Sequence, residues 1–405
     1  MTPQDPLTIL AIASYEKGHA FLRQAKQEGA RVFLLTSLSL KDTAQWPREA
    51  LDDIFYMPDE AKVWNLEDTI KAVSYLARTQ PIDRIVALDD FDLEKAATLR
   101  EHLRLPGLGE SATRRFRDKL AMRMTAAAAG IAVPEFIHVL HHGRLADFIA
   151  RVPAPWVLKP RSSAGAMGIK KIHDAGELWE ALGRLGDEQS HYLLERYVPG
   201  DIFHVDTIVF GGEIRFAVAS GYGRPPMDVA HGGGVFTTRL LERGSTVEQA
   251  LLALNRSVLG ALGLEYGISH TEYILGREDG RLYFLETSAR VGGAHIAELI
   301  EAATGLNLWA EWARVETAAG VKPYAVAPLR EDYAGLLVSL ARQERPDASA
   351  YQDPEIVWRL DKKHHVGFIV RSPSFARVAG LLDSLTARVQ QDFSAYAPPR
   401  DRPTE

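Results

Sequence analysis

Apolar runs of strand length alternate with amphipathic segments along the first 110 residues. Segments 7–13, 31–37 and 83–89 are rich in apolar residues and have the length of strands, whereas 16–29, 65–80 and 92–103 have the spacing of helices. This alternation favours a parallel sheet covered by helices, so we predict a doubly wound α/β domain over residues 1–112. The turn after the first predicted strand reads ASYEKG and lacks G-x-G-x-x-G. We therefore expect a scaffold or a substrate wall here rather than a dinucleotide site.

The pattern changes after residue 110 to strands joined by short helices. A capped helix is predicted within 111–130, ending at Gly130, and strands are predicted at 136–140, 156–160, 168–172, 192–198, 203–210 and 213–220. A helix near 246–262, a hairpin at 271–287 and a helix at 306–316 follow. We predict one domain over 113–320, a small α+β domain over 321–396, and a disordered tail at 397–405.

Composition narrows the class of protein. The 405 residues are 46% hydrophobic and 25% charged with a net charge of −6, which gives no general attraction to nucleic acid or to anionic lipid. No apolar run is long enough for a membrane helix, and residues 1–14 predict a strand rather than a signal peptide. The absence of cysteine excludes disulfides and thiolate metal sites. A cytoplasmic enzyme that binds neither nucleic acid nor membrane fits these features, and a homodimer is left open.

A glycine-rich loop interrupts two predicted strands. The strand WVLKP carries Lys159 at its end, and SSAGAMG follows it. The backbone N–H groups of such a loop can surround polyphosphate oxygens, and a lysine beside it supplies a point charge. An ordinary surface hairpin is the competing interpretation.

Two glutamates are predicted to face each other across the hairpin at 271–287. A hairpin that is symmetric about Asp279 places Glu272 opposite Glu286, where like charges repel unless a cation lies between them. All-oxygen ligation suits Mg²⁺ or Mn²⁺. Ser288 and Arg290 continue the same face, which brings a hydroxyl near the metal and a guanidinium near any phosphate bound to it. The alternative is a solvated charged face on an edge hairpin.

A glycine- and proline-rich segment at 220–238 lies between these motifs and is predicted to be a loop over the substrate site. Tyr222, Arg224 and His231 are its candidates for binding an acid or an amine, and Gly293 is a further candidate in the small-residue run after the hairpin. For each of these residues, an irregular surface loop is an equally good interpretation.

Taken in order, these motifs resemble the ATP-grasp superfamily, in particular its carboxylate–amine ligase and biotin-carboxylase-like branches. The resemblance covers residues 113–317 closely and implies nucleotide-binding lysines at Lys119 and Lys159. It implies a closing loop over the phosphates and a hinge strand, LLERYVPG, that contacts adenine. It also implies that Glu272 and Glu286 hold Mg²⁺ or Mn²⁺ and that Arg290, with Lys159, is catalytic. The residues implied to bind ATP are Lys119, Lys159, Ser162, Ser163, Gly165, Met167, Gly168, Glu195, Arg196, Tyr197, Val198 and Asp201.

Two positions depart from the family pattern. Ser288 stands where an asparagine is common in the family, which puts a second metal contact in doubt. The glutamate that usually binds the ribose is either replaced by Asp201 or missing. The resemblance implies an ATP-dependent, ADP-forming ligase that activates a carboxylate as an acyl phosphate for attack by an amine. A carboxylase using bicarbonate and biotin, and a non-catalytic ATP-binding protein, are the alternatives.

Overall fold

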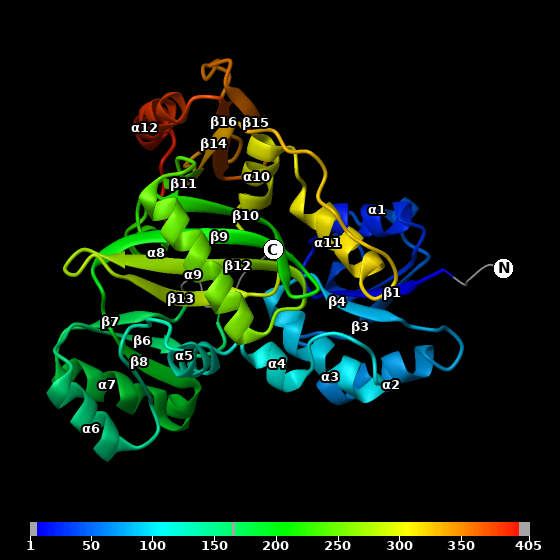
Figure 1. Ribbon diagram of the computed structural model, residues 1–405, viewed down its shortest axis with the longest axis horizontal. Coiled ribbons are helices and arrows are strands. Elements are labelled where there is room, and N and C mark those ends of the chain that lie inside the picture. Colours follow the sequence, from blue (N-terminus) through cyan, green and yellow to red (C-terminus); the bar gives the residue numbers. More distant parts are fainter. Residues whose placement is uncertain (1–5, 164–166, 397–405) are drawn as a thin grey trace.

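The computed structural model describes residues 6–163 and 167–396, apart from the side chain of His231. Figure 1 shows three parts in contact: a parallel α/β layer, a small antiparallel lobe and a large antiparallel sheet. The predicted tail at 397–405, and Gly165 in the glycine-rich loop, lie outside the described residues. Within the described ranges, no helix is both long enough and apolar enough to cross a bilayer.

The first part of the chain forms a parallel sheet from β1 (Thr8–Ala13), β2 (Arg31–Ser37), β3 (Asp53–Met57) and β4 (Arg84–Ala87). Its helices are α1 (His19–Gln27), α2 (Leu66–Leu76) and α3 (Leu93–Leu103). The strand order is β3-β2-β1-β4. Alternate β1 residues face opposite sides, because Ile9 packs with α1 whereas Leu10 packs with α2 and α3. The predicted doubly wound layer is confirmed.

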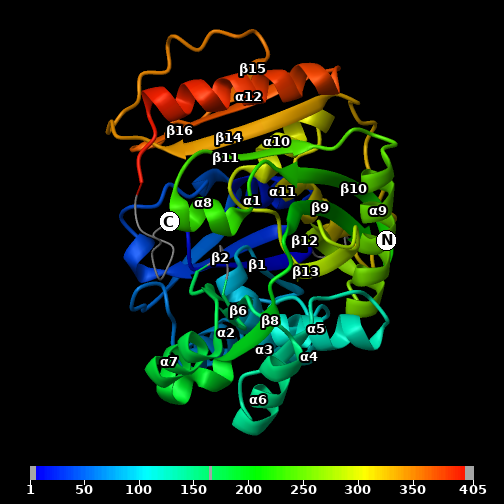
Figure 2. The same cartoon turned by 90° about the vertical axis from the view of Figure 1, so that its left-hand side faces the viewer.

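The small lobe is an antiparallel sheet with the order β5-β8-β6-β7. Its strands are β5 (Phe136–His138), β6 (Trp156–Pro160), β7 (Lys170–Ile172) and β8 (Tyr192–Arg196). Helices α6 (His142–Arg151) and α7 (Ala175–Leu185) pack against it through Leu145, Leu178 and Trp156. Figure 2 shows α6 and α7 of this lobe at the lower end of the view.

The connection into the small lobe differs from the prediction of a single helix over 111–130. It contains two helices, α4 (Glu110–Arg114) and α5 (Lys119–Ala128). The break falls before Asp118, whose carboxylate accepts a hydrogen bond from the Leu120 amide at 2.9 Å and so caps α5. An N-cap residue has extended backbone, so the aspartate that starts α5 also separates it from α4. Beyond α5, Gly130 has φ +76°, as predicted for a helix stop.

The large sheet has the order β13-β12-β9-β10-β11-β14-β16-β15. Its strands are β9 (Gly200–Phe210), β10 (Glu213–Tyr222), β11 (Phe236–Leu240), β12 (Tyr266–Gly276), β13 (Leu282–Ser288), β14 (Tyr333–Leu340), β15 (Ile356–Arg359) and β16 (His365–Ser372). Strand β14 pairs with β11, so the C-terminal segment extends the same sheet (Figure 1). The boundary near residue 320 stays a prediction about domains.

Helices cover this sheet on both sides. They are α8 (Pro226–Gly232), α9 (Thr246–Leu262), α10 (Ile296–Thr304), α11 (Leu308–Ala318) and α12 (Phe375–Asp392). Figure 2 shows α12 lying along β14 and β16. Short 3-10 helices occur at η1 (Leu38–Leu40), η2 (Arg48–Ala50), η3 (Asp90–Asp92) and η4 (Gly186–His191). The segment 220–238, predicted to be a loop, contains α8 and β11, and α10 lacked a sequence prediction.

Candidate active site

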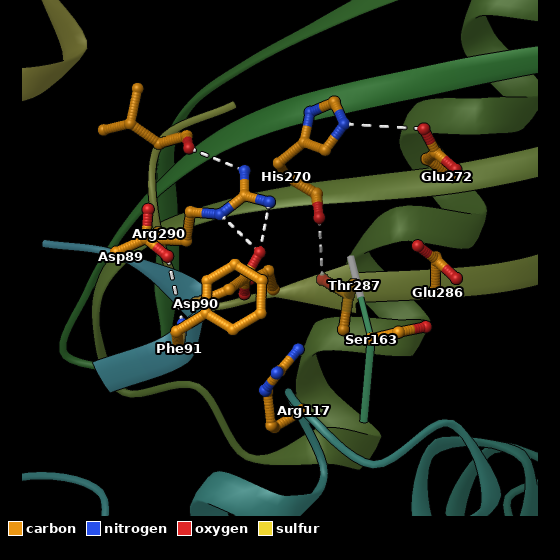
Figure 3. A network of polar contacts seen from close by, with 12 residues as sticks. Asp89, Asp90, Phe91, Arg117, Ser163, His270, Glu272, Glu286, Thr287 and Arg290 are labelled. Carbon is orange, nitrogen blue, oxygen red and sulfur yellow. Dashed lines mark hydrogen bonds and ion pairs between the residues drawn. The ribbon is translucent and has the colours of Figure 1, made fainter. Parts of the chain in front are cut away.

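Glu272 on β12 and Glu286 on β13 are directly paired in the strand register, as the sequence predicts. The ladder shifts between Glu272 and Tyr273, so the hairpin is not symmetric down to its turn. The two carboxylates therefore face each other as predicted. The symmetry about Asp279 that was used to predict this pairing does not hold between the two glutamates and the turn. Figure 3 shows the two side chains on neighbouring strands. Directly opposed side chains have Cβ atoms about 4.5–5.5 Å apart, where unpaired negative charges repel.

Tyr222 and His270 both approach one oxygen of Glu272. The Tyr222 hydroxyl donates to Glu272 Oε1 at 2.8 Å, and His270 Nε2 lies 3.7 Å from the same oxygen. Within the described chain, the other oxygen, Oε2, takes no hydrogen bond. Tyr222, a candidate for substrate binding, therefore lies against a candidate metal ligand instead. One carboxylate oxygen of Glu272 is held in place, and the second is available to a cation.

A buried set of three residues, here called the histidine triad, supports His270. It consists of His204, Asp206 and His270, and each imidazole Nδ1 bonds a different Asp206 oxygen, at 2.7 and 2.9 Å. Burial raises the pKa of the Asp206 carboxyl, but the two imidazoles outweigh burial and hold it below its usual range. Burial lowers the pKa of His270, and Asp206 outweighs this to raise it to about 9.

These three side chains are close enough together to hold a metal ion. The distances from ring nitrogen to oxygen are nevertheless those of hydrogen bonds, and each Asp206 oxygen is already used by one imidazole. His204 Nε2 is also occupied, because it lies 2.8 Å from the Thr238 hydroxyl. We interpret the histidine triad as a hydrogen-bonded support for the strand face that carries Glu272.

Lys119 and the glycine-rich loop lie against the second glutamate. Lys119 Nζ is 3.3 Å from Glu286 Oε2 and donates to the Ser163 carbonyl at 2.6 Å. Arg117 donates to the Ser162 carbonyl at 2.8 Å. Lys119 is buried, so its ammonium is held at the junction of the loop and β13. The start of the loop therefore meets the glutamate pair, as the motif order predicts.

A second buried set, here called the lysine triad, is formed by Arg123, Lys159 and Glu195. Glu195 forms an ion pair with Lys159 and accepts from Arg123 Nε at 3.1 Å and from Arg123 Nη2 at 3.0 Å. Burial lowers the pKa of Lys159 to about 8, although Glu195 opposes this effect. The Glu195 side chain therefore orients Lys159, a role that the sequence motif did not indicate.

Three cavities follow one another across these residues. The first has a volume of about 190 Å³ and is lined by Lys159 of β6, by the hinge residues Glu195, Arg196, Tyr197 and Val198, and by both glutamates. Asp201, predicted as a ribose contact, is absent from this lining and pairs with Arg277 at 2.7 Å on the surface. The hinge residues are thus brought together as predicted, and Asp201 is not among them.

The second cavity, of about 250 Å³, shares both glutamates with the first and adds Lys119, Ser163 and Arg290. The Arg290 Nε donates to Asp90 Oδ2 at 2.8 Å, and the Ser288 hydroxyl donates to the other Asp90 oxygen. Burial raises the pKa of Asp90, but the charges of Arg290 and Arg117 outweigh it and hold the pKa well below its usual range. Figure 3 shows Asp90 between the parallel layer and Arg290.

The third cavity is the largest, at about 880 Å³, and lies between the parallel layer and α10. It shares Asp90, Arg290 and Gly293 with the second cavity, and the three adjoining cavities are together called the active-site trough. Met167 also lines it, whereas Gly168 lies outside and packs on Pro160. Lys17 and Asp89, from the parallel layer, form an ion pair at its wall. The expectation that this layer forms a substrate wall agrees with the lining.

A second candidate from the 220–238 segment, Arg224, is not brought into the trough. Arg224 is exposed, donates to the Gly233 carbonyl at 3.2 Å and lines none of the three cavities. The side chain of His231 lies outside the described residues. Neither residue supplies an argument about substrate.

Sequence reasoning missed Asp90, Arg123 and the histidine triad. His270 and Glu272 are two residues apart on one strand and therefore face the same side of the sheet. The same alternation that located Ser288 could have located His270. Arg123 is four residues after Lys119 on α5 and shares its helix face. No pattern in the sequence around Asp90 could indicate its role, because its partners Ser288 and Arg290 are 198 and 200 residues away in the chain.

Comparisons with known proteins agree with this architecture. No family model matches the chain. It is 27% identical over 241 residues to an L-arginine-specific L-amino acid ligase of Bacillus subtilis, covering 58% of this chain and 57% of that protein. An L-amino acid ligase from Bacillus licheniformis has a similar structure, with a TM-score of 0.73 and 19% identity over 97% of this chain and 100% of that chain.

A further solved structure is N5-carboxyaminoimidazole synthetase from Staphylococcus aureus complexed with ADP, with a TM-score of 0.70, 16% identity, and coverage of 93% of this chain and 96% of that chain. The chain spans about half the length of the first curated relatives that it matches. The predicted fold class is confirmed, and these likenesses agree with the resemblance to the ATP-grasp superfamily. Two of the three relatives described above are named L-amino acid ligases, which agrees with the predicted class of enzyme.

Proposed function

We propose that the chain is an ATP-dependent ligase that joins a carboxylate to an amine, with ADP and phosphate as the other products. The observation that carries this proposal is the order of groups along the active-site trough. The hinge and Lys159 lie at one end, the paired glutamates and Lys119 in the middle, and Arg290 beside the largest cavity. This order suits a nucleotide whose terminal phosphate points toward a substrate in the large cavity.

Glu272 and Glu286 would hold Mg²⁺ or Mn²⁺. Two opposed carboxylates, one with an oxygen free of hydrogen bonds, match the all-oxygen ligation that these ions prefer. When bound, the metal neutralises negative charge on the phosphates. Ser288 is a weaker candidate ligand, because its hydroxyl is already donated to Asp90.

The protein residues act by positioning and by charge. In the proposed reaction, a carboxylate oxygen of the substrate bonds to the γ-phosphorus of ATP, and the bond from that phosphorus to the β–γ bridging oxygen breaks, releasing ADP. Lys119, Lys159 and Arg290 stabilise the charge on the transferred phosphoryl group. The amine nitrogen then attacks the acyl carbon of the acyl phosphate, phosphate leaves and the nitrogen loses a proton. Two amino acids are the proposed substrates, in line with the named relatives.

Nucleotide products separate this proposal from its alternatives. Purified chain, Mg²⁺ and ATP are incubated with pairs of L-amino acids, and ADP, AMP and phosphate are quantified. We expect ADP and phosphate in equal amounts with at least one pair, and loss of both with Glu286→Gln. Stoichiometric AMP would overturn the acyl-phosphate route. ADP release only with bicarbonate and biotin would instead favour a carboxylase, and ATP binding without turnover in any arm would favour a non-catalytic protein.

A further inference from the structure

A separate cavity of about 380 Å³ lies between the parallel layer and the large sheet, away from the active-site trough. Here called the interdomain cavity, it is lined by β4, α3, the 106–113 connection, the start of β12 and α11. Ala289 faces it, whereas Ser288 and Arg290, on either side in the chain, line the trough. The two sites therefore lie on opposite faces of the same segment. The volume falls within the roughly 300–1,000 Å³ of small-molecule sites.

Two guanidinium groups line the interdomain cavity. Arg84 donates to the carbonyls of Asp83 and Ala319, and Arg100 donates to those of Ile85 and Leu108. A guanidinium has five N–H donors, so each arginine keeps donors beyond these backbone bonds. Within the described chain, neither arginine forms an ion pair. The backbone bonds fix both side chains in place, and among the described residues no carboxylate lies within ion-pair distance of either guanidinium.

The wall of the cavity is shaped around Arg100. Gly107 has φ +123°, and a Cβ atom there would lie 3.0 Å from Arg100 Cδ. A glycine at this position lets the 106–113 connection pass directly over the arginine stem. The 106–113 connection therefore packs closely against Arg100 at the cavity wall.

A carboxyl group faces the same space. Glu316 accepts a hydrogen bond from the Trp312 indole at 3.0 Å. Its pKa is raised, chiefly by burial, while the charges of Arg100 and Arg84 act in the opposite direction. Over the described residues, Glu316 forms no ion pair with Arg84, Arg100 or any other cation. The lining of this cavity thus contains two cations and one carboxyl group that, among the described residues, form no ion pair with one another.

We propose that the interdomain cavity binds a small zwitterion of amino-acid or dipeptide size. Its carboxylate pairs with Arg84 and Arg100, its ammonium pairs with Glu316, and the apolar wall formed by Ala87, Leu93 and Trp312 takes its side chain. Such a ligand supplies both missing partners at once, which a simple anion or a simple cation cannot do. Pairing with the ligand would offset the free-energy cost of partly removing the charges of Arg84, Arg100 and Glu316 from water.

The position of the cavity connects it to the trough. Strand β4 runs from Arg84 in the cavity wall toward Asp90, and β13 leads past Ala289 to Arg290. The ligand therefore contacts both segments that join in the ion pair of Asp90 and Arg290. Occupancy of the cavity is expected to shift nucleotide affinity in the trough, and nucleotide must then shift the affinity of the zwitterion by the same factor.

Calorimetric binding tests the site without requiring turnover. L-Amino acids and L-alanyl-L-alanine are titrated in turn into the full chain carrying Arg290→Gln, which removes a cation beside the largest cavity of the trough. At least one zwitterion is expected to bind at one site per chain. Glu316→Gln is expected to weaken that binding roughly ten- to hundredfold, the effect of losing a charged hydrogen bond. Propionate, which lacks an ammonium, is expected to be insensitive to this change.

Controls keep the result independent of folding and of the proposed ligase activity. Glu316→Gln keeps an oxygen for the Trp312 hydrogen bond, and Arg100→Gln provides a second test from the opposite wall. Glu94→Gln and Arg78→Gln alter exposed residues of the same layer and are expected to change nothing. The absence of any binding in the Arg290→Gln chain, or equal affinity with and without Glu316→Gln, overturns the proposal. Neither outcome depends on whether ADP is released.

Discussion

The lysine triad and the histidine triad lie on two sides of the paired glutamates, and they are built differently. The lysine triad joins α5, β6 and β8, with one carboxylate between two cations. The histidine triad lies within the large sheet, where His270 and Asp206 are paired directly in the ladder of β12 and β9. The first brings a cation to the nucleotide end of the trough, whereas the second supports a carboxylate that faces a metal.

The difference shows how buried charge is tolerated in the two regions. Arginine remains charged under all ordinary conditions, so the lysine triad depends on Glu195. An imidazole can become neutral near physiological pH. If the carboxylate of the histidine triad is lost, its imidazoles can therefore release a proton and avoid the free-energy cost of an unpaired buried charge. The two triads should therefore respond unequally to equivalent substitutions.

Glu195→Gln is expected to have the largest effect. It leaves Arg123 and Lys159 buried beside each other without an anion, and breaking a buried pair in this way costs about 3–5 kcal/mol of unfolding free energy. Urea unfolding of the variant and the parent chain measures the loss. Glu188→Gln, at an exposed position, serves as the matched control and should change stability by less than about 0.5 kcal/mol. A loss below about 1 kcal/mol for Glu195→Gln would contradict the view that Glu195 holds the triad together.

Glu286→Gln is expected to act on catalysis between the two triads. It removes charge from the proposed metal site, and by analogy with the loss of other electrostatic stabilisers it should lower kcat about 10²–10³-fold. Because Glu286 is only partly buried, the free energy of unfolding should change little. Steady-state ADP release and urea unfolding are compared with those of Glu278→Gln, an exposed substitution in the same hairpin. Near-normal turnover would exclude Glu286 from the metal site.

Asp206→Asn is expected to cost less stability than Glu195→Gln. The amide can still accept one imidazole hydrogen bond, and the unpaired imidazole can become neutral, so the loss should be about 1–3 kcal/mol. The same urea unfolding experiment gives the value. Tyr222→Phe, which also removes a polar group near Glu272 but leaves the triad intact, is the comparison variant. If Asp206→Asn destabilises more than Glu195→Gln, the proposed difference between the triads is wrong.

The smallest expected effect is a pH dependence confined to the lysine triad. Lys159 has a pKa of about 8 in the folded chain, below its ordinary 10.5, so it loses its charge as pH rises through 8. ATP affinity should fall above pH 8 by at most about tenfold per pH unit. Stability moves the opposite way: the unfolded chain binds more protons between pH 8 and 10.5, so this group's contribution to stability increases there.

Fluorescence titration of ATP between pH 7 and 9 tests this dependence. Lys159→Met is expected to bind ATP more weakly at pH 7 and to lose the additional weakening above pH 8. Lys170→Met, at the exposed start of the adjacent strand β7, is the matched control. An unchanged pH profile in Lys159→Met would assign the dependence to another group.

Local patterns were sufficient for most elements of this chain. Continuous apolar runs located β1, β2 and β6, and helical spacing located α9 with its observed bounds. Alternation along the 271–287 hairpin placed Glu272, Glu286 and Ser288 on one face. These features depend on residues close in sequence, whose side-chain direction follows from the period of the element. The segment with α8 and β11 was missed because its glycines and prolines carry no such period.

The environment of these residues required the folded chain. Asp90 meets Ser288 and Arg290 across about half of the sequence, and Glu195 meets Arg123 and Lys159 only when α5, β6 and β8 converge. No local period encodes such contacts, because they depend on how separate elements pack and on which charges that packing buries. The sequence by itself therefore determined most of the helices and strands, the opposed glutamates and the order of the motifs. The shape of the trough, the partners of its charges and the interdomain cavity arose from long-range packing, which brings together residues that are distant in the sequence.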